Sequence, residues 1–211
     1  MYKDILQSIE EKKIIAILKE LSFSQNMKTI ETLIESGITN IEISLSTLNA
    51  LEYIKEAVKE FDKVANIGAG TIKNQEDARK AIEAGARFLV TPNLSINAIE
   101  YANTEGVLII PGVLTNTEII TAQDLGCSMV KLFPVSAVSE KYIKQIKGPL
   151  DNVKIMAVGG VDMENASKYI NLGVNAVGVG SALIRRDLIE KGDYDSLKIH
   201  FEEFKNKLNI G

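Results

Sequence analysis

The stretch that decides the fold is Leu125-Gly126-Cys127-Ser128-Met129-Val130-Lys131-Leu132-Phe133-Pro134, because it contains a pattern that the rest of the chain repeats. A glycine typical of a helix C-terminus is followed by a short apolar run, and the run ends at a proline. We predict a β-strand at each such run, over residues 14–18, 40–44, 65–70, 88–92, 107–111, 129–134, 154–160 and 176–180. Their average spacing is roughly 23 residues, about the length of one strand and one helix.

The segments between these runs show helical periodicity, and glycines 37, 85, 106, 126 and 173 each stand where a helix would end. Eight strand-then-helix units with nearly continuous apolar strands indicate a parallel sheet covered by helices. We therefore predict a compact (β/α)₈ TIM barrel. An open doubly wound sheet is the alternative, but no G-x-G-x-x-G motif follows the first strand. Amphipathic helices are expected at both ends, marked by Ile5, Leu6 and Ile9 and by Leu197, Phe201, Phe204 and Leu208.

The composition excludes several classes of protein. The chain has 211 residues, 24 Lys and Arg, and 28 Asp and Glu, which gives a net charge of −4. We expect one domain over residues 1–211, and the acidic balance argues against a nucleic-acid partner. The single cysteine cannot form an intramolecular disulfide, and no apolar run approaches the ~20 residues of a membrane span. We therefore expect a cytoplasmic protein without a membrane partner.

Two ionisable residues stand in the middle of predicted strands. Alternation along a barrel strand sends Lys131 inward if Val130 and Leu132 pack outward, and the same parity sends Glu42 inward. Burial would lower the pKa of the lysine, leaving a free amine suited to Schiff-base formation with a ketone. Glu42 would then transfer protons beside it. The structural alternatives are a lysine that extends to solvent and a Glu42–Lys131 ion pair.

Glycine-rich turns end the last two predicted strands, at Gly159-Gly160 and at Gly180-Ser181. In barrels the loops after these strands often bind phosphate through backbone N–H groups. The pair of turns therefore predicts a phosphorylated substrate.

Other residues near the same rim are candidates for substrate binding, among them Lys19, Ser46 and Thr71. Thr71 could donate to a carboxylate, or could instead cap a helix that starts near Asn74. No group of His, Cys, Asp and Glu has metal-ligand spacing, so we expect neither a metal nor a cofactor. His200 is expected on the surface of the last helix, and Cys127 in an inert core position.

Taken together, the motifs resemble the bacterial 2-keto-3-deoxy-6-phosphogluconate (KDPG) and 4-hydroxy-2-oxoglutarate (KHG) aldolases, Schiff-base enzymes with small barrels. The resemblance spans essentially the whole chain. It is carried by the segments 41–43, 68–71, 90–93, 111–113, 130–134, 148–150, 158–161 and 177–181.

The resemblance implies a role for each of several residues. Lys131 corresponds to the Schiff-base lysine and Glu42 to the general acid and base. It places Thr71, Ser46, Lys19, Pro92, Phe133 and Val158 around the substrate, and Gly159, Gly160, Gly180 and Ser181 at its phosphate. It also implies a homotrimer.

Two positions depart from the phosphogluconate branch, which has Arg where this chain has Ser46 and Thr where it has Val158. With Thr91-Pro92-Asn93, they are more similar to the 2-keto-3-deoxy-6-phosphogalactonate branch. The expected reaction is cleavage of a 2-keto-3-deoxy-6-phospho-sugar acid to pyruvate and D-glyceraldehyde 3-phosphate. Cleavage of unphosphorylated 4-hydroxy-2-oxoglutarate to pyruvate and glyoxylate, and non-covalent binding of a sugar phosphate, are the alternatives.

Overall fold

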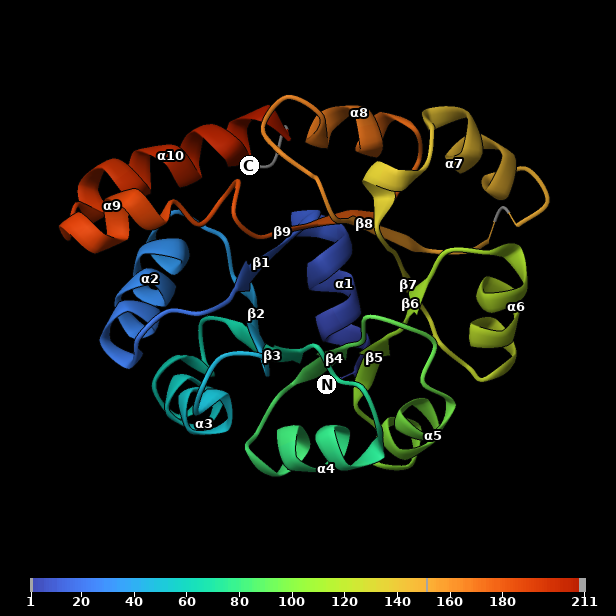
Figure 1. Ribbon diagram of the computed structural model, residues 1–211, viewed down its shortest axis with the longest axis horizontal. Helices are drawn as coiled ribbons and strands as arrows, with labels where there is room; N and C mark the ends of the chain where they lie inside the picture. Colours follow the sequence, from blue (N-terminus) through green and yellow to red (C-terminus); the bar gives the residue numbers. More distant parts are fainter. Residues whose placement is uncertain (1, 151, 209–211) are drawn as a thin grey trace.

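The computed structural model describes residues 2–150 and 152–208, which form a parallel sheet curved into a barrel and surrounded by helices (Figure 1). The sheet order is β5-β4-β3-β2-β1-β9-β8-β7-β6. The strands are β1 (Ile14–Leu18), β2 (Asn40–Ser44), β3 (Asn66–Gly70), β4 (Phe88–Val90), β5 (Leu108–Ile110), β6 (Gly112–Val113), β7 (Val130–Leu132), β8 (Ile155–Val158) and β9 (Ala176–Val179). The predicted TIM barrel is confirmed.

The helices follow the strands in alternation. They are α1 (Tyr2–Lys12), α2 (Phe23–Glu35), α3 (Ala50–Phe61), α4 (Gln75–Glu83), α5 (Ile96–Thr104), α6 (Asn116–Asp124), the 3₁₀ turn η1 (Val135–Ala137), α7 (Glu140–Lys147), α8 (Ala166–Asn171), α9 (Arg186–Lys191) and α10 (Tyr194–Lys207). The five glycines expected at helix ends have φ angles between 66° and 95°. A side chain is strained in that region, which explains the choice of glycine.

The fifth predicted strand, 107–111, is the main departure from expectation. The structure divides it into β5, which pairs with β4, and β6, which pairs with β7. Pro111 lies at the break, where it has no N–H to donate, while its carbonyl accepts from the Lys131 N–H at 2.8 Å. One extended segment therefore joins the two ends of the sheet order, and the barrel closes through it.

Most other predicted strands are one or more residues too long. Strand β4 ends at Val90, β7 at Leu132, β8 at Val158 and β9 at Val179. Prolines or glycines follow most of these ends, and Gly159 and Gly160 have positive φ, which a regular ladder does not accommodate. Apart from Val158, the last residue of β8, the residues proposed for substrate contact therefore lie in loops at the carboxyl end of the barrel.

Two separate apolar clusters show why the site must open at that end. The outer cluster, between strands and helices, includes Ile41, Ile43, Val130 and Leu132. The inner cluster fills the barrel and includes Ile5, Leu6 and Ile9 of α1. Figure 1 shows α1 lying across the middle of the ring of strands. The amino end of the barrel is thus filled, and the carboxyl end is left for a ligand.

In the described residues, no helix is both long and apolar enough to cross a membrane.

Candidate active site

Lys131 occupies the middle of β7 with its side chain inside the barrel, as the strand parity predicts. Its neighbours Val130 and Leu132 belong to the outer cluster, while Lys131 is only 7% exposed. Its Nζ lies 4.6 Å from the centroid of the Phe133 ring. Burial lowers the pKa of the amine below its usual value, and the charge of Glu42 opposes that shift in part. Such an amine is more readily available as a nucleophile than an exposed lysine.

Glu42 lies on the inner face of β2 and is 2% exposed. Burial raises the pKa of this carboxyl to about 7, although the positive charge of Lys131 acts against the rise. Its Oε2 has no hydrogen-bond partner among the described residues. A Cβ at Gly70 would overlap Oε1, so glycine at that position makes room for the carboxylate.

The two groups belong to opposite sides of the barrel, because β1, β9 and β8 separate β2 from β7 in the sheet order. Their charges interact across the interior, but within the described chain no salt bridge or hydrogen bond joins the two side chains. The structural alternatives, an exposed lysine and a direct ion pair, are therefore not what the structure contains. A buried amine with a lowered pKa and a carboxyl with a pKa of about 7 both lie inside the barrel.

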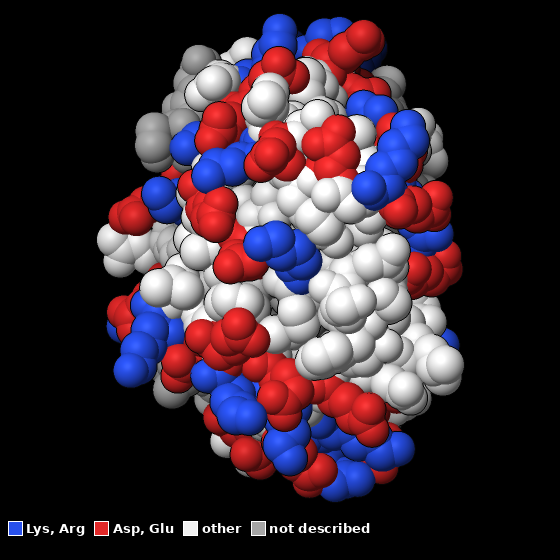
Figure 2. Space-filling model, turned by 90° about the vertical axis from the view of Figure 1, so that its left-hand side faces the viewer, with Lys and Arg blue, Asp and Glu red and all other residues white. Residues whose placement is uncertain are grey.

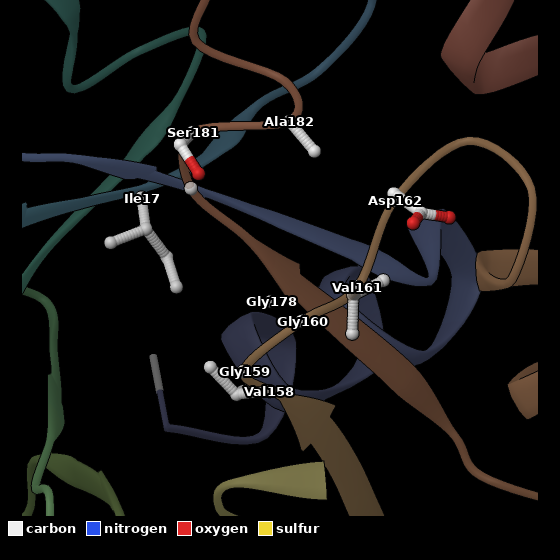
Figure 3. A pocket seen from close by; sticks show the side chains of 10 residues that line it. Ile17, Val158, Gly159, Gly160, Val161, Asp162, Gly178, Ser181 and Ala182 are labelled. Carbon is white, nitrogen blue, oxygen red and sulfur yellow. The ribbon is translucent and has the colours of Figure 1, made fainter. Parts of the chain in front are cut away.

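A cavity of about 390 Å³ opens between the carboxyl ends of β8 and β9, beside β1 (Figure 3). All four residues of the predicted phosphate site line it: Gly159, Gly160, Gly180 and Ser181. Consecutive positive φ angles of 93° and 78° explain why both residues of the Gly159–Gly160 turn are glycines, and without side chains an anion could approach their backbone closely. The Asn165 side chain donates to the Gly160 carbonyl at 2.8 Å and holds the turn in place.

The apolar wall of this cavity lies next to Glu42 on the neighbouring strand. Val158 and Ile17 line it together, and Gly178 leaves them room, since a Cβ there would lie 2.8 Å from Val158 Cγ2. Ile17 is also the register partner of Glu42 on the neighbouring strand. Side chains of paired residues point to the same face of a sheet, so the cavity and the carboxyl are adjacent.

Lys19 lines a second cavity of about 330 Å³ that shares Ile17, Gly180 and Ser181 with the first. Its ammonium is 3.2 Å from a carboxylate oxygen of Glu20, and Arg186 Nη2 is 3.0 Å from the other. The structure thus places Lys19 beside the residues predicted to bind phosphate. Nothing in the local sequence indicates that Glu20 and Arg186 form an ion pair, because folding brings them together from distant parts of the chain.

Phe133 contacts Lys131, and Pro92 packs against Gly112 on the strand next to that of Lys131. A Cβ at Gly112 would overlap the backbone of Pro92, and Gly112 is the register partner of Lys131. The Phe133 ring contacts the lysine directly. Of these two predicted substrate contacts, Phe133 therefore lies next to the amine, and Pro92 lies one strand away at the same end of the barrel.

Thr71 and Ser46 lie at the carboxyl ends of β3 and β2, and Ser44 joins them. Ser44 Oγ is 2.7 Å from Thr71 Oγ1 and 2.8 Å from Ser46 Oγ. The alternative role of Thr71 as a helix cap is wrong, because Asn74 caps α4 by accepting from the Asp77 N–H. Sequence reasoning missed Ser44, although its position two residues after Glu42 on the same strand face was a usable signal.

Three smaller expectations concern residues outside this site. His200 is half-buried rather than fully on the surface, and a ring nitrogen lies 2.9 Å from the Ala182 carbonyl oxygen. Cys127 is buried, and burial raises the pKa of its thiol to about 12, so it stays protonated. Over the described residues, no group of three or more His, Cys, Asp and Glu could hold a metal ion.

Comparison with known proteins indicates the class of protein, because the similar proteins are named aldolases. A curated protein of Rhizobium meliloti (strain 1021), named probable 2-dehydro-3-deoxy-6-phosphogalactonate aldolase, is 35% identical over 83% of each chain. The 2-dehydro-3-deoxy-6-phosphogalactonate aldolase of Escherichia coli (strain K12) is 34% identical over 82% of this chain and 84% of its own. A solved structure described as native KDPGal superposes with a TM-score of 0.84 at 30% identity, covering 93% of this chain and 96% of the other.

The family follows from a second match. Residues 5–199 match the KDPG and KHG aldolase family. The chain belongs to this family, and the predicted resemblance is confirmed.

Proposed function

We propose that this protein is a class I aldolase that cleaves a 2-keto-3-deoxy-6-phospho-sugar acid to pyruvate and D-glyceraldehyde 3-phosphate. The observation that carries the proposal is the buried Lys131 amine that faces the Glu42 carboxyl inside the barrel. Membership of an aldolase family supports it.

The reaction begins at Lys131. The neutral amine attacks the C2 ketone of the substrate, and loss of water from the carbinolamine leaves an iminium ion. Glu42 supplies the proton that the departing hydroxide needs, because a carboxyl with a pKa of about 7 is partly protonated at neutral pH. The Phe133 ring packs against the lysine and fixes its position.

Cleavage then uses the iminium as an electron sink. Glu42, now ionised, takes the proton of the C4 hydroxyl, and the C3–C4 bond breaks as its electron pair forms an enamine with C2. Glyceraldehyde 3-phosphate is released. The enamine takes up a proton at C3, and water hydrolyses the resulting iminium to pyruvate and the free Lys131 amine.

The rest of the site holds the two ends of the substrate. We assign the carboxylate to Thr71, with Ser46 nearby, and the phosphate to Gly159, Gly160, Gly180 and Ser181. Lys19 contributes positive charge on the phosphate side. We assign Pro92, which packs against Gly112, to the wall of the keto-acid end, and Val158 to an apolar contact near the sugar hydroxyls. Binding energy from the phosphate thereby orients C2 to C4 between Lys131 and Glu42.

We also propose that residues 1–211 act as one domain and assemble as a homotrimer, as the family resemblance implies. Figure 2 shows an uncharged area on the side that carries α2 and α3, with charged regions above and below it. On this side Phe23 and Leu48 are 44% and 81% exposed, and the Phe23 ring is 5.4 Å from that of Tyr53. Exposed apolar side chains on an uncharged surface support contact between copies of the chain. Sedimentation of the purified protein measures the assembly directly.

Borohydride trapping tests the proposed function. Incubation with pyruvate and sodium borohydride should add one stable reduced adduct, which peptide mass spectrometry should locate at Lys131. A pyruvate-release assay on both phosphorylated epimers and on 4-hydroxy-2-oxoglutarate then identifies the substrate. Absence of an adduct, or an adduct at another lysine, would refute the mechanism.

A further inference from the structure

Three hydroxyl groups form a short chain at the carboxyl ends of β2 and β3. Ser44 is the central member, 2.7 Å from Thr71 Oγ1 and 2.8 Å from Ser46 Oγ. The Ser46 backbone N–H also points to Ser44 Oγ, at 3.4 Å. Ser44 is 2% exposed and lies two residues beyond Glu42, so its hydroxyl is on the inner face of β2 directly above the carboxyl.

Thr71 adopts a backbone conformation that threonine rarely takes. Its φ angle is 61°, in the left-handed region, which a β-branched side chain disfavours. Such conformations persist only where the surroundings enforce them, and they concentrate at functional sites. The hydrogen bond to Ser44 is one of the contacts that hold the Thr71 hydroxyl where it is.

The direction of the hydrogen bonds follows from what Thr71 binds. A hydroxyl has one hydrogen to donate, and two lone pairs that accept. When Thr71 gives its hydrogen to a carboxylate, its oxygen can only accept from Ser44, so Ser44 must donate to it. Ser44 then accepts from the hydroxyl and the N–H of Ser46. The three groups align in one direction, and each bond strengthens the next.

We infer that Ser44 is a positioning residue, which turns the Thr71 hydroxyl hydrogen toward the carboxylate of the bound keto acid. The inference rests on the proposed function, because it assigns the carboxylate to Thr71. Within the described residues, the hydrogen bonds of these hydroxyls join them to one another and to the Ser46 N–H. In this proposal the carboxylate meets aligned neutral donors, with Ser44 buried at their centre.

The test uses the half-reaction that needs only the keto-acid end of the substrate. Pyruvate bound to Lys131 exchanges its C3 hydrogens with D₂O through the enamine, and NMR follows the exchange. The variant S44A should raise KM for pyruvate about tenfold and change kcat by less than about threefold. The variant S46A should raise KM only about twofold, because the backbone N–H at residue 46 remains.

A double-mutant comparison separates positioning from simple loss of stability. In the T71A background, S44A should have almost no further effect, because Ser44 acts only through the Thr71 hydroxyl. Ser36→Ala is the matched control. Ser36 is also a serine at 2% exposure, but its hydroxyl bonds to the Thr32 carbonyl at the end of α2. It should leave KM for pyruvate unchanged.

The outcomes are distinct. An S44A variant with unchanged KM, or with the same tenfold loss in the T71A background, would overturn the positioning role. A wild-type protein that neither exchanges pyruvate nor forms an adduct at Lys131 would instead refute the proposed function itself.

Discussion

The two ends of the proposed site differ in their chemical groups: one has buried ionisable side chains, and the other has glycine-rich backbone. The reacting end places two ionisable side chains, Lys131 and Glu42, in a dry interior where burial shifts both pKa values. The proposed phosphate end is an open cavity with glycine backbone at residues 159, 160, 178 and 180 and the hydroxyl of Ser181, and the Asp162 carboxylate on its wall accepts from the backbone N–H groups of Glu164 and Asn165. Chemistry requires groups that change protonation state, whereas anion binding requires only N–H donors at fixed positions. The barrel supplies the first from strand interiors and the second from turns.

The strongest way to test this division is to remove the amine. Lys131→Ala should lower kcat/KM for the phosphorylated substrate by ~10³-fold or more, and should abolish pyruvate exchange, since both need the Schiff base. Lys154→Ala is the control: Lys154 pairs with Glu10 at the opposite end of β8, 2.8 Å away, and activity should be retained. Retention of activity in the Lys131 variant would exclude covalent catalysis at this position.

A change at the phosphate end should affect only one of the two assays. A Cβ at residue 160 would lie 2.7 Å from Ser136 Cβ and would require the unfavourable φ of 78°. Gly160→Ala should therefore lower kcat/KM for cleavage by about 30-fold while pyruvate exchange stays within about twofold. Gly148→Ala, where the nearest atom is 3.7 Å away, should have no effect on either assay. Equal losses in both assays would contradict two separable ends.

The pH dependence of stability probes the reacting end by itself. Glu42 has a pKa of about 7 in the folded chain against 4.5 in an ordinary setting, so the folded state binds its proton more tightly. Its stabilising contribution is complete below pH 4.5 and is lost as the pH rises through about 7. Removing this titration with Glu42→Gln should therefore raise the melting temperature relative to wild type at pH 8 more than at pH 5. The expected difference corresponds to about 3 kcal/mol.

Melting curves at the two pH values provide the measurement. Glu60→Gln, which changes an exposed carboxylate on α3, is the control and should shift little at either pH. If the Glu42 variant and wild type differ equally at pH 5 and pH 8, the carboxyl titrates in its ordinary range.

The smallest expected effect concerns the wall between the two ends. Val158→Thr adds a hydroxyl beside Ile17 without a large change of volume. It should change the ratio of kcat/KM values for the gluco and galacto epimers by about threefold to tenfold, because a hydroxyl can bond a sugar oxygen. Val158→Ile, which adds no polar atom, should shift the ratio less. A ratio unaffected by the threonine would remove Val158 from the basis of specificity.

Much of the fold was predictable because the local signals agree with one another. Apolar runs, helix-ending glycines and regular spacing each indicate the same barrel, and the parity of Glu42 and Lys131 places both side chains inside. The break at Pro111 was not predicted. A proline at the end of an apolar run predicts the end of a strand. Only the pairing of β5 with β4 and of β6 with β7 shows that a second strand begins directly after Pro111.

The parts of the site that depend on one residue type, such as a lysine within a strand, were predictable from the sequence. The parts that depend on contacts between residues distant in the sequence were less so. Gly70 lies in the segment 68–71 that carries the family resemblance, yet only the three-dimensional structure shows that it leaves room for the Glu42 carboxylate. Glu20 and Arg186 are separated by more than a hundred residues, and nothing in the local sequence of either indicates their contact. Sequence periodicity reports which face of an element a residue occupies, but not which distant loop lies opposite.

Helix α1 closes the amino end of the barrel and leaves the carboxyl end open to solvent. Its Ile5, Leu6 and Ile9 fill the amino end, so everything that enters or leaves must pass the rim formed by the loops after the strands. In the proposed reaction the phosphate-bearing fragment lies nearer this rim, while pyruvate remains bonded to Lys131 deeper inside. The aldehyde must therefore depart first, and the keto acid last. Closure of one end of the barrel thus sets the order in which the two products leave.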